Sequence, residues 1–284
     1  MLFSWLPSIS RSRPHGAFAT LLALGITLFP LPSLALEDLQ LPDEMGLPSR
    51  REAGGTRGPC ITDQNSQLMA IIPEFNVGRT LSDSPTVFVH LPKHNTDRGI
   101  LIVQELDREK LAQAGLTLGD LDAQNQDQFL KSEFESSVAL NQDAGILGVP
   151  LSSHPQLPKL EAGKIYLWAF QLVCNNTLSD YTQGWIQVVN PDENQGTVKA
   201  QLDEAKSDRD RAKIYAQTGL WYDLLATLAQ LRQTDAGPDR DRATADWNSV
   251  LSHPQVGLDE LVNAPLLSCC TVSANSPTAI EVAP

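Results

Sequence analysis

The run from Lys164 to Cys174 constrains the fold more than any other stretch of the sequence. In an extended chain, successive side chains point to opposite faces, and this run is apolar on both faces. One face carries Tyr166, Trp168, Phe170 and Leu172, and the other carries Ile165, Leu167, Ala169 and Val173. A strand of this kind must be covered on both sides, so we predict a central, buried strand.

Other short runs before residue 190 are rich in β-branched or aromatic residues and are bounded by Gly, Pro, Asn and Asp. They are Leu68–Ile72, Thr86–Leu91, Ile100–Leu106, Gly145–Leu151 and Trp185–Val189. The prolines bracket these runs rather than interrupt them, as expected at strand ends. Residues 107–143 are less regular and predict a surface excursion that is partly helical. The pattern predicts a mainly β fold, an antiparallel, immunoglobulin-like β-sandwich.

After Gly196 the apolar period changes from two residues to that of a helix. The expected helices cover Leu202–Ala216, Leu220–Arg232 and Arg240–Leu251. The second has an apolar stripe at the i, i+3, i+4, i+7 spacing. The junction Tyr215–Asp223 resembles that of a tetratricopeptide-type hairpin, but one copy is present where a solenoid needs several. We expect a helical subdomain that caps the sandwich, with a repeat scaffold as the alternative.

The first 35 residues have the three parts of a secretory signal peptide. Arg11, Arg13 and His15 form a basic front. An uncharged run from Ala17 to Phe29 and a small-residue cleavage site at Ser33–Ala35 follow. The run is shorter than the roughly 20 residues of a membrane-spanning helix, so no transmembrane anchor is expected after cleavage. We predict export to the periplasm or the medium, with the thylakoid lumen as an alternative.

These patterns together predict the organisation of the chain. It has a signal peptide over 1–35, a linker over 36–47, a sandwich over 48–196, a helical subdomain over 197–268 and a disordered tail over 269–284. Because residues 1–35 carry two basic and no acidic residues, the net charge of −13 becomes −15 after cleavage. Such a charge argues against binding nucleic acid or anionic lipid, which both require a basic surface.

Four cysteines follow the signal peptide, and export permits disulfides. Cys60 and Cys174 are isolated in the sequence, and we predict that they are bonded to each other. Cys269 and Cys270 are adjacent, precede a tail rich in Ser, Thr, Ala and Pro, and are expected in a mobile segment. None of the four has the paired short spacing of a zinc site or a dithiol redox motif.

The sequence contains no recognisable set of catalytic residues. It lacks a nucleophile elbow, a phosphate-binding glycine-rich loop and a calcium loop. His90 and His94 are four residues apart, but the intervening proline disfavours the helical geometry that would direct both at one metal. His154 and His253 each precede a proline and are expected on loop surfaces. We predict no catalytic residue, no metal site and no cofactor.

The loop formed by Gly54, Gly55, Thr56, Arg57 and Gly58 is the most unusual local string. Its three glycines let the backbone pass close to another group while one arginine projects from it. We favour a structural role, in which Arg57 pairs with a carboxylate or helix carbonyls near Cys60. The alternative is a recognition loop in which Arg57 binds a carboxylate or phosphate of a partner.

Five blocks occur in the order typical of one family: Gly54–Cys60, Pro85–Pro92, Gly163–Cys174, Gly184–Ile186 and Tyr215–Arg232. On these blocks, which span residues 48–267, the chain resembles the domain of unknown function 928 family, found in cyanobacteria. The Gly-Gly-Thr-Arg-Gly-x-Cys loop and the Gly-Leu-Trp-Tyr-Asp junction are the most specific. Val87–His90 departs from the family pattern, where more aromatic residues are expected. The resemblance implies a secreted protein and supplies no catalytic residues.

Two classes of function fit these observations. The favoured one is a non-catalytic envelope module that binds an envelope or periplasmic protein partner through loops or the helical unit. The competing one is a hydrolase of wall or surface polysaccharide, with carboxylates brought together from separate strands. A cavity with two convergent carboxylates, one of raised pKa, would favour the hydrolase.

Overall fold

The computed structural model describes residues 39–41, 45–48, 51–52, 59–63, 65–75, 77–190 and 196–269. The predicted signal peptide, the loop Gly54–Gly58, and Cys270 with the rest of the predicted tail lie outside the described residues. The strands are β1 (Met69–Ala70), β2 (Val77–Thr80), β3 (Thr86–Leu91), β4 (Arg98–Glu105), β5 (Phe134–Ala139), β6 (Gly145–Pro150), β7 (Ile165–Cys174), β8 (Thr177–Val188) and β9 (Leu266–Leu267). The α-helices are α1 (Arg108–Gln113), α2 (Gly196–Glu204), α3 (Asp208–Thr218), α4 (Trp221–Thr234) and α5 (Pro238–Leu251). Short 3-10 helices are η1 (Leu118–Asp120), η2 (Gln126–Phe129), η3 (Leu151–Ser153) and η4 (Asp259–Leu261).

The described strands form two sheets, with the orders β1-β3-β6-β9 and β2-β8-β7-β4-β5. Most neighbours are antiparallel, but β2 pairs with β8 and β6 pairs with β9 in parallel. The prediction of an antiparallel arrangement is therefore wrong for these two pairs. With five α-helices beside nine strands, the described residues form a mixed α/β structure, and the predicted mainly β class is not confirmed.

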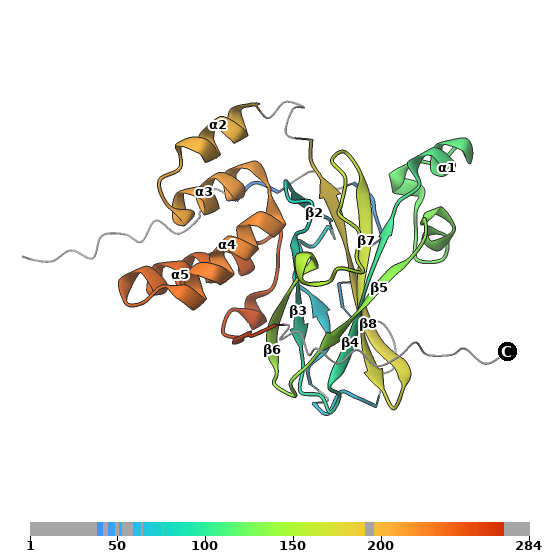
Figure 1. Ribbon diagram of the computed structural model, residues 1–284, viewed down its shortest axis with the longest axis horizontal. Coiled ribbons are helices and arrows are strands. Elements are labelled where there is room, and N and C mark those ends of the chain that lie inside the picture. The colour runs from blue at the N-terminus through green and yellow to red at the C-terminus, as the bar shows by residue number, and fades with distance from the viewer. Residues whose placement is uncertain are drawn as a thin grey trace, which may run out of the picture. The chain divides into compact units, whose positions relative to one another are not determined.

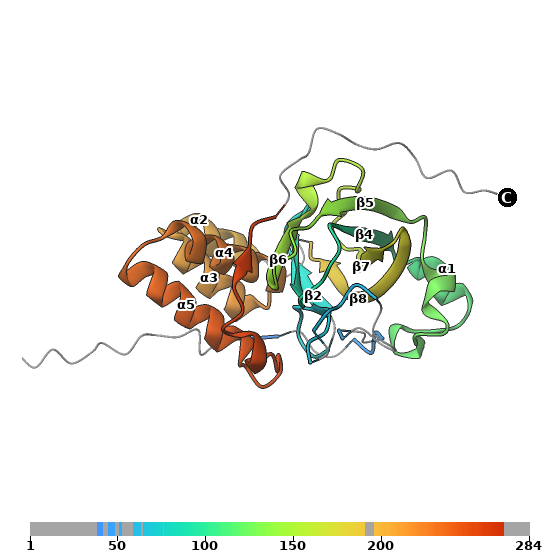
Figure 2. The same cartoon turned by 90° about the horizontal axis from the view of Figure 1, so that it is seen from below.

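β7 lies in the interior of the larger sheet, as its two apolar faces predict. Tyr166, Trp168, Phe170 and Leu172 belong to the main core, which also contains Val87 and Val89 of β3. Ile165 and Leu167 point to the other face, where they pack with Leu111 of α1 and Phe129 of η2. In Figure 2 the strands of the two sheets lie around a common interior, and α1 lies outside the larger sheet.

Helices α2–α5 gather beside the smaller sheet (Figure 1). Phe88 of β3 points away from Val87 and Val89 and meets Trp247 of α5 edge to face, with ring centroids 6.0 Å apart. Trp221, Leu225 and Trp247 belong to the same main core as the strand residues. The helical unit is thus integral to the core of the sheets.

The predicted helix over Leu202–Ala216 is divided into α2 and α3. Ser207 causes this division, because its extended backbone precedes α3 and its side chain accepts a hydrogen bond from Asp210 N as an N-cap. None of the helices in the described ranges has both the length and the apolarity needed to cross a membrane.

Candidate functional site

The disulfide predicted between Cys60 and Cys174 is present, with the two Cα atoms 5.6 Å apart. It joins the segment before β1 to the last residue of β7. Two backbone hydrogen bonds fix the same segment to the loop after β3: Thr62 N donates to Lys93 O (2.8 Å), and Asn95 N donates to Cys60 O (3.0 Å). Three loops distant in sequence are therefore held together at this end of the larger sheet.

A cavity of about 530 Å³ opens beside the disulfide. Its polar lining residues are Asn95, Thr96, Asp97, Arg98, Gln142, Asn175 and Asn176. We call it the amide-lined cavity, because four of these side chains end in an amide. Its volume lies within the roughly 300–1,000 Å³ typical of small-molecule sites.

The walls of the amide-lined cavity are fixed by local hydrogen bonds. Asn175 and Asn176 have φ angles of 50° and 60°, which is the left-handed pair that a two-residue hairpin turn requires, and they join β7 to β8. Arg98 Nη2 donates to Asn176 Oδ1 at 3.4 Å, and Thr96 Oγ1 donates to Val173 O at 2.5 Å. These two bonds connect the β7–β8 hairpin to the segment at the start of β4.

The chemistry of the cavity is that of hydrogen bonding. Amides and hydroxyls donate and accept, and Asp97 and Arg98 are the only charged groups among the described lining residues. That lining contains neither two carboxylates nor a nucleophile beside a base. The described geometry therefore suits reversible binding of a polar group.

The Gly-Leu-Trp-Tyr-Asp junction has a different role, which the structure makes clear. Trp221 Nε1 donates to Ile71 O after β1 (3.1 Å), and the Tyr222 hydroxyl donates to Trp185 O on β8 (3.0 Å). Asp223 Oδ2 accepts from Leu81 N after β2 (3.1 Å). Three consecutive side chains thus fasten the start of α4 to three different strand segments.

A second, smaller cleft of about 170 Å³ lies at this junction. Most of its lining side chains carry a hydroxyl group: Thr80, Ser82, Ser84, Thr86, Tyr215, Tyr222 and Thr227. Asp223 is the only carboxylate of the described lining, and burial raises its pKa to about 6 against the lowering effect of its bonds to Thr80 and Leu81. Asp223 lines the cleft and is partly buried.

The family comparison gives a match over nearly all of this architecture. The model of the Domain of Unknown Function DUF928 matches residues 52–266. The chain belongs to the DUF928 family. The matched range includes both cysteines of the disulfide and the whole Gly-Leu-Trp-Tyr-Asp junction. No curated protein and no solved structure matches the chain.

This DUF928 protein also contains a serine–histidine contact that its sequence does not reveal. Ser136 Oγ lies 2.8 Å from His154 Nδ1, and the two residues are 6% and 7% exposed. The prediction of His154 on a loop surface is wrong, because η3 turns it inward against β5. Ser136 Oγ also lies 3.3 Å from Gln156 Oε1, so its single proton has two acceptors within reach, and the tautomer of His154 decides which bond it makes.

His90 and His94 of the DUF928 chain are directed to different surroundings. His90 Nδ1 lies 3.1 Å from Gln67 O, whereas both ring nitrogens of His94 are buried and lack a hydrogen-bond partner. Burial lowers the pKa of each imidazole. The described residues contain no cluster of three or more His, Cys, Asp or Glu that could hold a metal ion.

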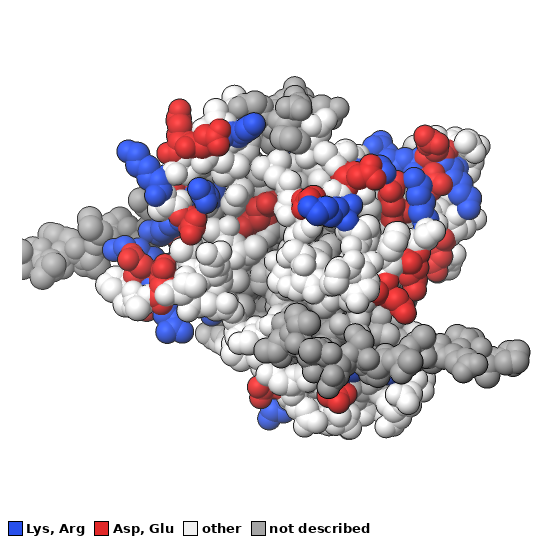
Figure 3. Space-filling view, viewed as in Figure 1, with Lys and Arg blue, Asp and Glu red and all other residues white. Residues whose placement is uncertain are grey.

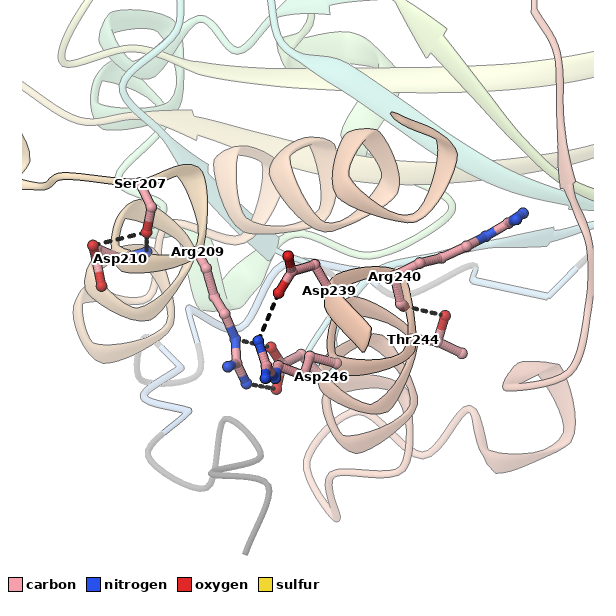
Figure 4. Close-up of polar contacts among 8 residues, drawn as sticks. Ser207, Arg209, Asp210, Asp239, Arg240, Thr244 and Asp246 are labelled. Atoms are coloured by element: carbon pink, nitrogen blue, oxygen red, sulfur yellow. Dashed lines mark hydrogen bonds and ion pairs between the residues drawn. The ribbon is translucent and has the colours of Figure 1, made fainter. Parts of the chain in front are cut away.

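The charged side chains of the helical unit form a cluster of their own (Figure 4). Arg209 of α3 donates two hydrogen bonds to the carboxylate of Asp246 of α5, from Nε to Oδ2 (2.9 Å) and from Nη2 to Oδ1 (3.2 Å). Asp246 is buried, whereas the neighbouring pair of Arg242 and Asp239 (2.6 Å) is exposed. The first pair links two helices, and the second lies within one helical turn of α5.

On the face shown in Figure 3, charged side chains gather over α2–α5 and around α1, and a smaller group of both signs lies between them. The described residues on this face therefore form mixed patches of both signs, with no broad basic area.

Proposed function

We propose that this DUF928 protein is an exported, non-catalytic envelope protein that acts as a binding module, with the amide-lined cavity as its binding surface. The observation that carries the proposal is a cavity of about 530 Å³ whose walls are fixed by a disulfide and offer hydrogen-bonding groups. Fixing such groups before binding lowers the entropic cost of association. The proposed partner is an envelope or periplasmic protein.

Export is part of this proposal, with residues 1–35 as the signal peptide and a cyanobacterial cell envelope as the destination. The Cys60–Cys174 disulfide supports it, because disulfides persist in oxidising compartments and are rare in the cytosol. We further propose that the two sheets are an immunoglobulin-like sandwich to which parallel edge pairs have been added. The core shared by β3, β6, β4 and β7 supports that arrangement.

The polysaccharide hydrolase is less well supported. Asp223 provides a carboxylate of raised pKa in a cleft, but the described lining of that cleft holds no second carboxylate. Hydrolysis of a glycosidic bond generally needs two, one as the acid and the other as base or nucleophile.

Affinity capture tests the binding module. Oxidised protein covering residues 36–284 is immobilised, and envelope and periplasmic extracts of the source organism are passed over it. A paired variant, Asn95→Ala with Gln142→Ala, removes two exposed amides of the cavity without changing the left-handed residues of the hairpin turn. The matched control, Gln128→Ala with Gln233→Ala, removes two exposed amides elsewhere.

A specific protein retained by the wild type and the control, but lost from the cavity variant, supports the proposal. Equal retention by all three proteins contradicts the assignment of the surface. Recovery of glycan fragments that shorten with time contradicts the non-catalytic function. Arg57→Ala, in the loop outside the described residues, is run in parallel: lost capture with unchanged thermal stability indicates a recognition loop, and lost stability indicates a structural one.

A further inference from the structure

The cleft beside Asp223 lies where α3 and α4 meet the turn between β2 and β3. Its volume of about 170 Å³ is below that of sites for drug-sized ligands, so it admits only a small group. Residues that carry hydroxyl groups line it from both sides, with Thr80 and Ser84 on the strand side and Tyr215 and Thr227 on the helix side. Hydroxyl oxygens accept hydrogen bonds, and the described lining holds no basic side chain.

Asp223 supplies a negative charge to this cleft without a counter-ion. Oδ2 accepts from Leu81 N, and the Thr80 side chain also bonds to the carboxylate. The ion pairs among the described residues involve other carboxylates, and none includes Asp223. When a partly desolvated carboxylate accepts hydrogen bonds from uncharged donors only, a cation in contact with it stabilises its ionised form.

We propose that this cleft binds a primary ammonium group, with Asp223 as the counter-ion and the surrounding hydroxyl groups as hydrogen-bond acceptors. An ammonium group carries three donors, which one carboxylate and two hydroxyls satisfy. The rings of Tyr215 and Tyr222 line the same space and add an aromatic surface, to which cations are attracted. A calcium ion would require six to eight oxygen ligands, generally with several carboxylates, and is not matched by a single carboxylate.

A small free amine and a lysine side chain of a partner share this chemistry. In either case, binding requires the ionised form of Asp223, so it strengthens as the pH rises through about 6. The two tyrosines of the lining do not change charge over that range, because burial raises the pKa of both phenols. The other charged groups on the surrounding elements are Arg79 of β2 and the exposed pairs Lys159–Asp83 and Arg211–Asp208. The hydrogen bond from Lys159 lowers the pKa of Asp83.

The test uses n-butylammonium chloride, titrated into the oxidised chain of residues 36–284 and followed by amide NMR shifts. At pH 7.5 we expect saturable shifts at Leu81 and its neighbours. At pH 5 only about one-tenth of Asp223 is ionised, so binding should weaken about tenfold. n-Butanol, which has the same alkyl chain without the charge, should not bind. Nα-acetyl-lysine methylamide then distinguishes the sources: binding indicates a partner's lysine, and exclusion indicates a free amine.

Asp223→Asn should abolish the shifts, while Asp83→Asn, which removes the carboxylate of the exposed pair with Lys159, should leave them unchanged. Equal binding of n-butanol, undiminished binding to a folded Asp223→Asn protein, or equal affinity at both pH values overturns the proposal. If Asp223→Asn does not fold, the pH comparison on the unchanged protein decides. The amide-lined cavity is not involved, so either proposal can fail without the other.

Discussion

The hydroxyl group of Tyr222 accepts a hydrogen bond of 2.8 Å from the Trp168 indole, in the fully buried junction between α4 and β7. The same hydroxyl donates to the Trp185 carbonyl, so one atom satisfies groups of both β7 and β8. Trp168 and Trp185 belong to the two apolar layers on opposite sides of the larger sheet. This position gives the Trp-Tyr-Asp string of this chain a structural role.

Tyr222→Phe should lower the free energy of unfolding by about 1–3 kcal/mol, because it leaves the buried Trp168 indole donor without its partner. Urea denaturation monitored by tryptophan fluorescence measures the loss. Tyr215→Phe is the control, because Tyr215 lines the cleft and is only partly buried, so the loss of its hydroxyl group should cost less than about 0.5 kcal/mol. Equal losses in the two variants would show that the buried hydroxyl has no special role.

Gly78→Ala tests the close contact between β2 and the start of α4. A Cβ atom at Gly78 would lie 2.5 Å from Tyr222 Cε2 and 2.9 Å from Trp221 Cδ1, and both rings are fully buried. We expect a loss of about 1–3 kcal/mol in the free energy of unfolding, as in other overpacked cores. Gly119→Ala is the control, since its Cβ would meet only Thr117 Oγ1, at 3.9 Å. A melting temperature unchanged in Gly78→Ala would contradict this packing.

The sequence predicts the parts of the fold that are apolar in a regular pattern. β3 covers the predicted range, Thr86–Leu91, and β7 is identified by its two apolar faces. β5 is missed because it is an edge strand whose Glu135 and Ser137 are exposed, so it has no apolar alternation. β2 is missed because four residues, Val77–Thr80, become a strand only through pairing with β8.

The candidate site is harder to predict, because its residues lie far apart in the sequence. The disulfide could be predicted because Cys60 and Cys174 are isolated, although their separation is 114 residues. The cavity beside it combines loops around Asn95, Gln142 and Asn176, and no local pattern connects such residues. The burial of His154 depends likewise on where η3 packs against β5.

Arg209→Ala should destabilise the protein by about 3 kcal/mol, because it leaves the buried carboxylate of Asp246 without its charge partner. The neighbouring Arg242→Ala removes an exposed partner of Asp239 and should cost less than about 1 kcal/mol. Chemical denaturation of both variants at one ionic strength gives the comparison. A larger loss for Arg242→Ala would show that the exposed pair, rather than the link between α3 and α5, stabilises the helical unit.

His94 should make the protein sensitive to acid. Burial lowers the pKa of its imidazole in the folded state below the ordinary value of 6.5. Between those two pKa values the unfolded chain binds a proton that the folded chain does not, so the stabilisation present above pH 6.5 is lost as the pH falls. His90 and His154 act in the same direction, since burial lowers both pKa values. Asp223 acts in the opposite direction, because its raised pKa favours the folded state as the pH falls from about 6.

His94→Leu separates this effect from the others. Both ring nitrogens of His94 lack partners, so replacing the ring with an apolar side chain should leave stability at pH 7.5 unchanged or raised. The slope of unfolding free energy against pH, measured by urea denaturation between pH 7.5 and 5.5, should fall by up to about 1.4 kcal/mol per pH unit. His154→Leu should also reduce the slope, but at a cost in stability at pH 7.5, because it breaks the contact with Ser136. An unchanged slope in His94→Leu would mean that the buried imidazole accepts its proton as readily in the folded chain as in the unfolded one.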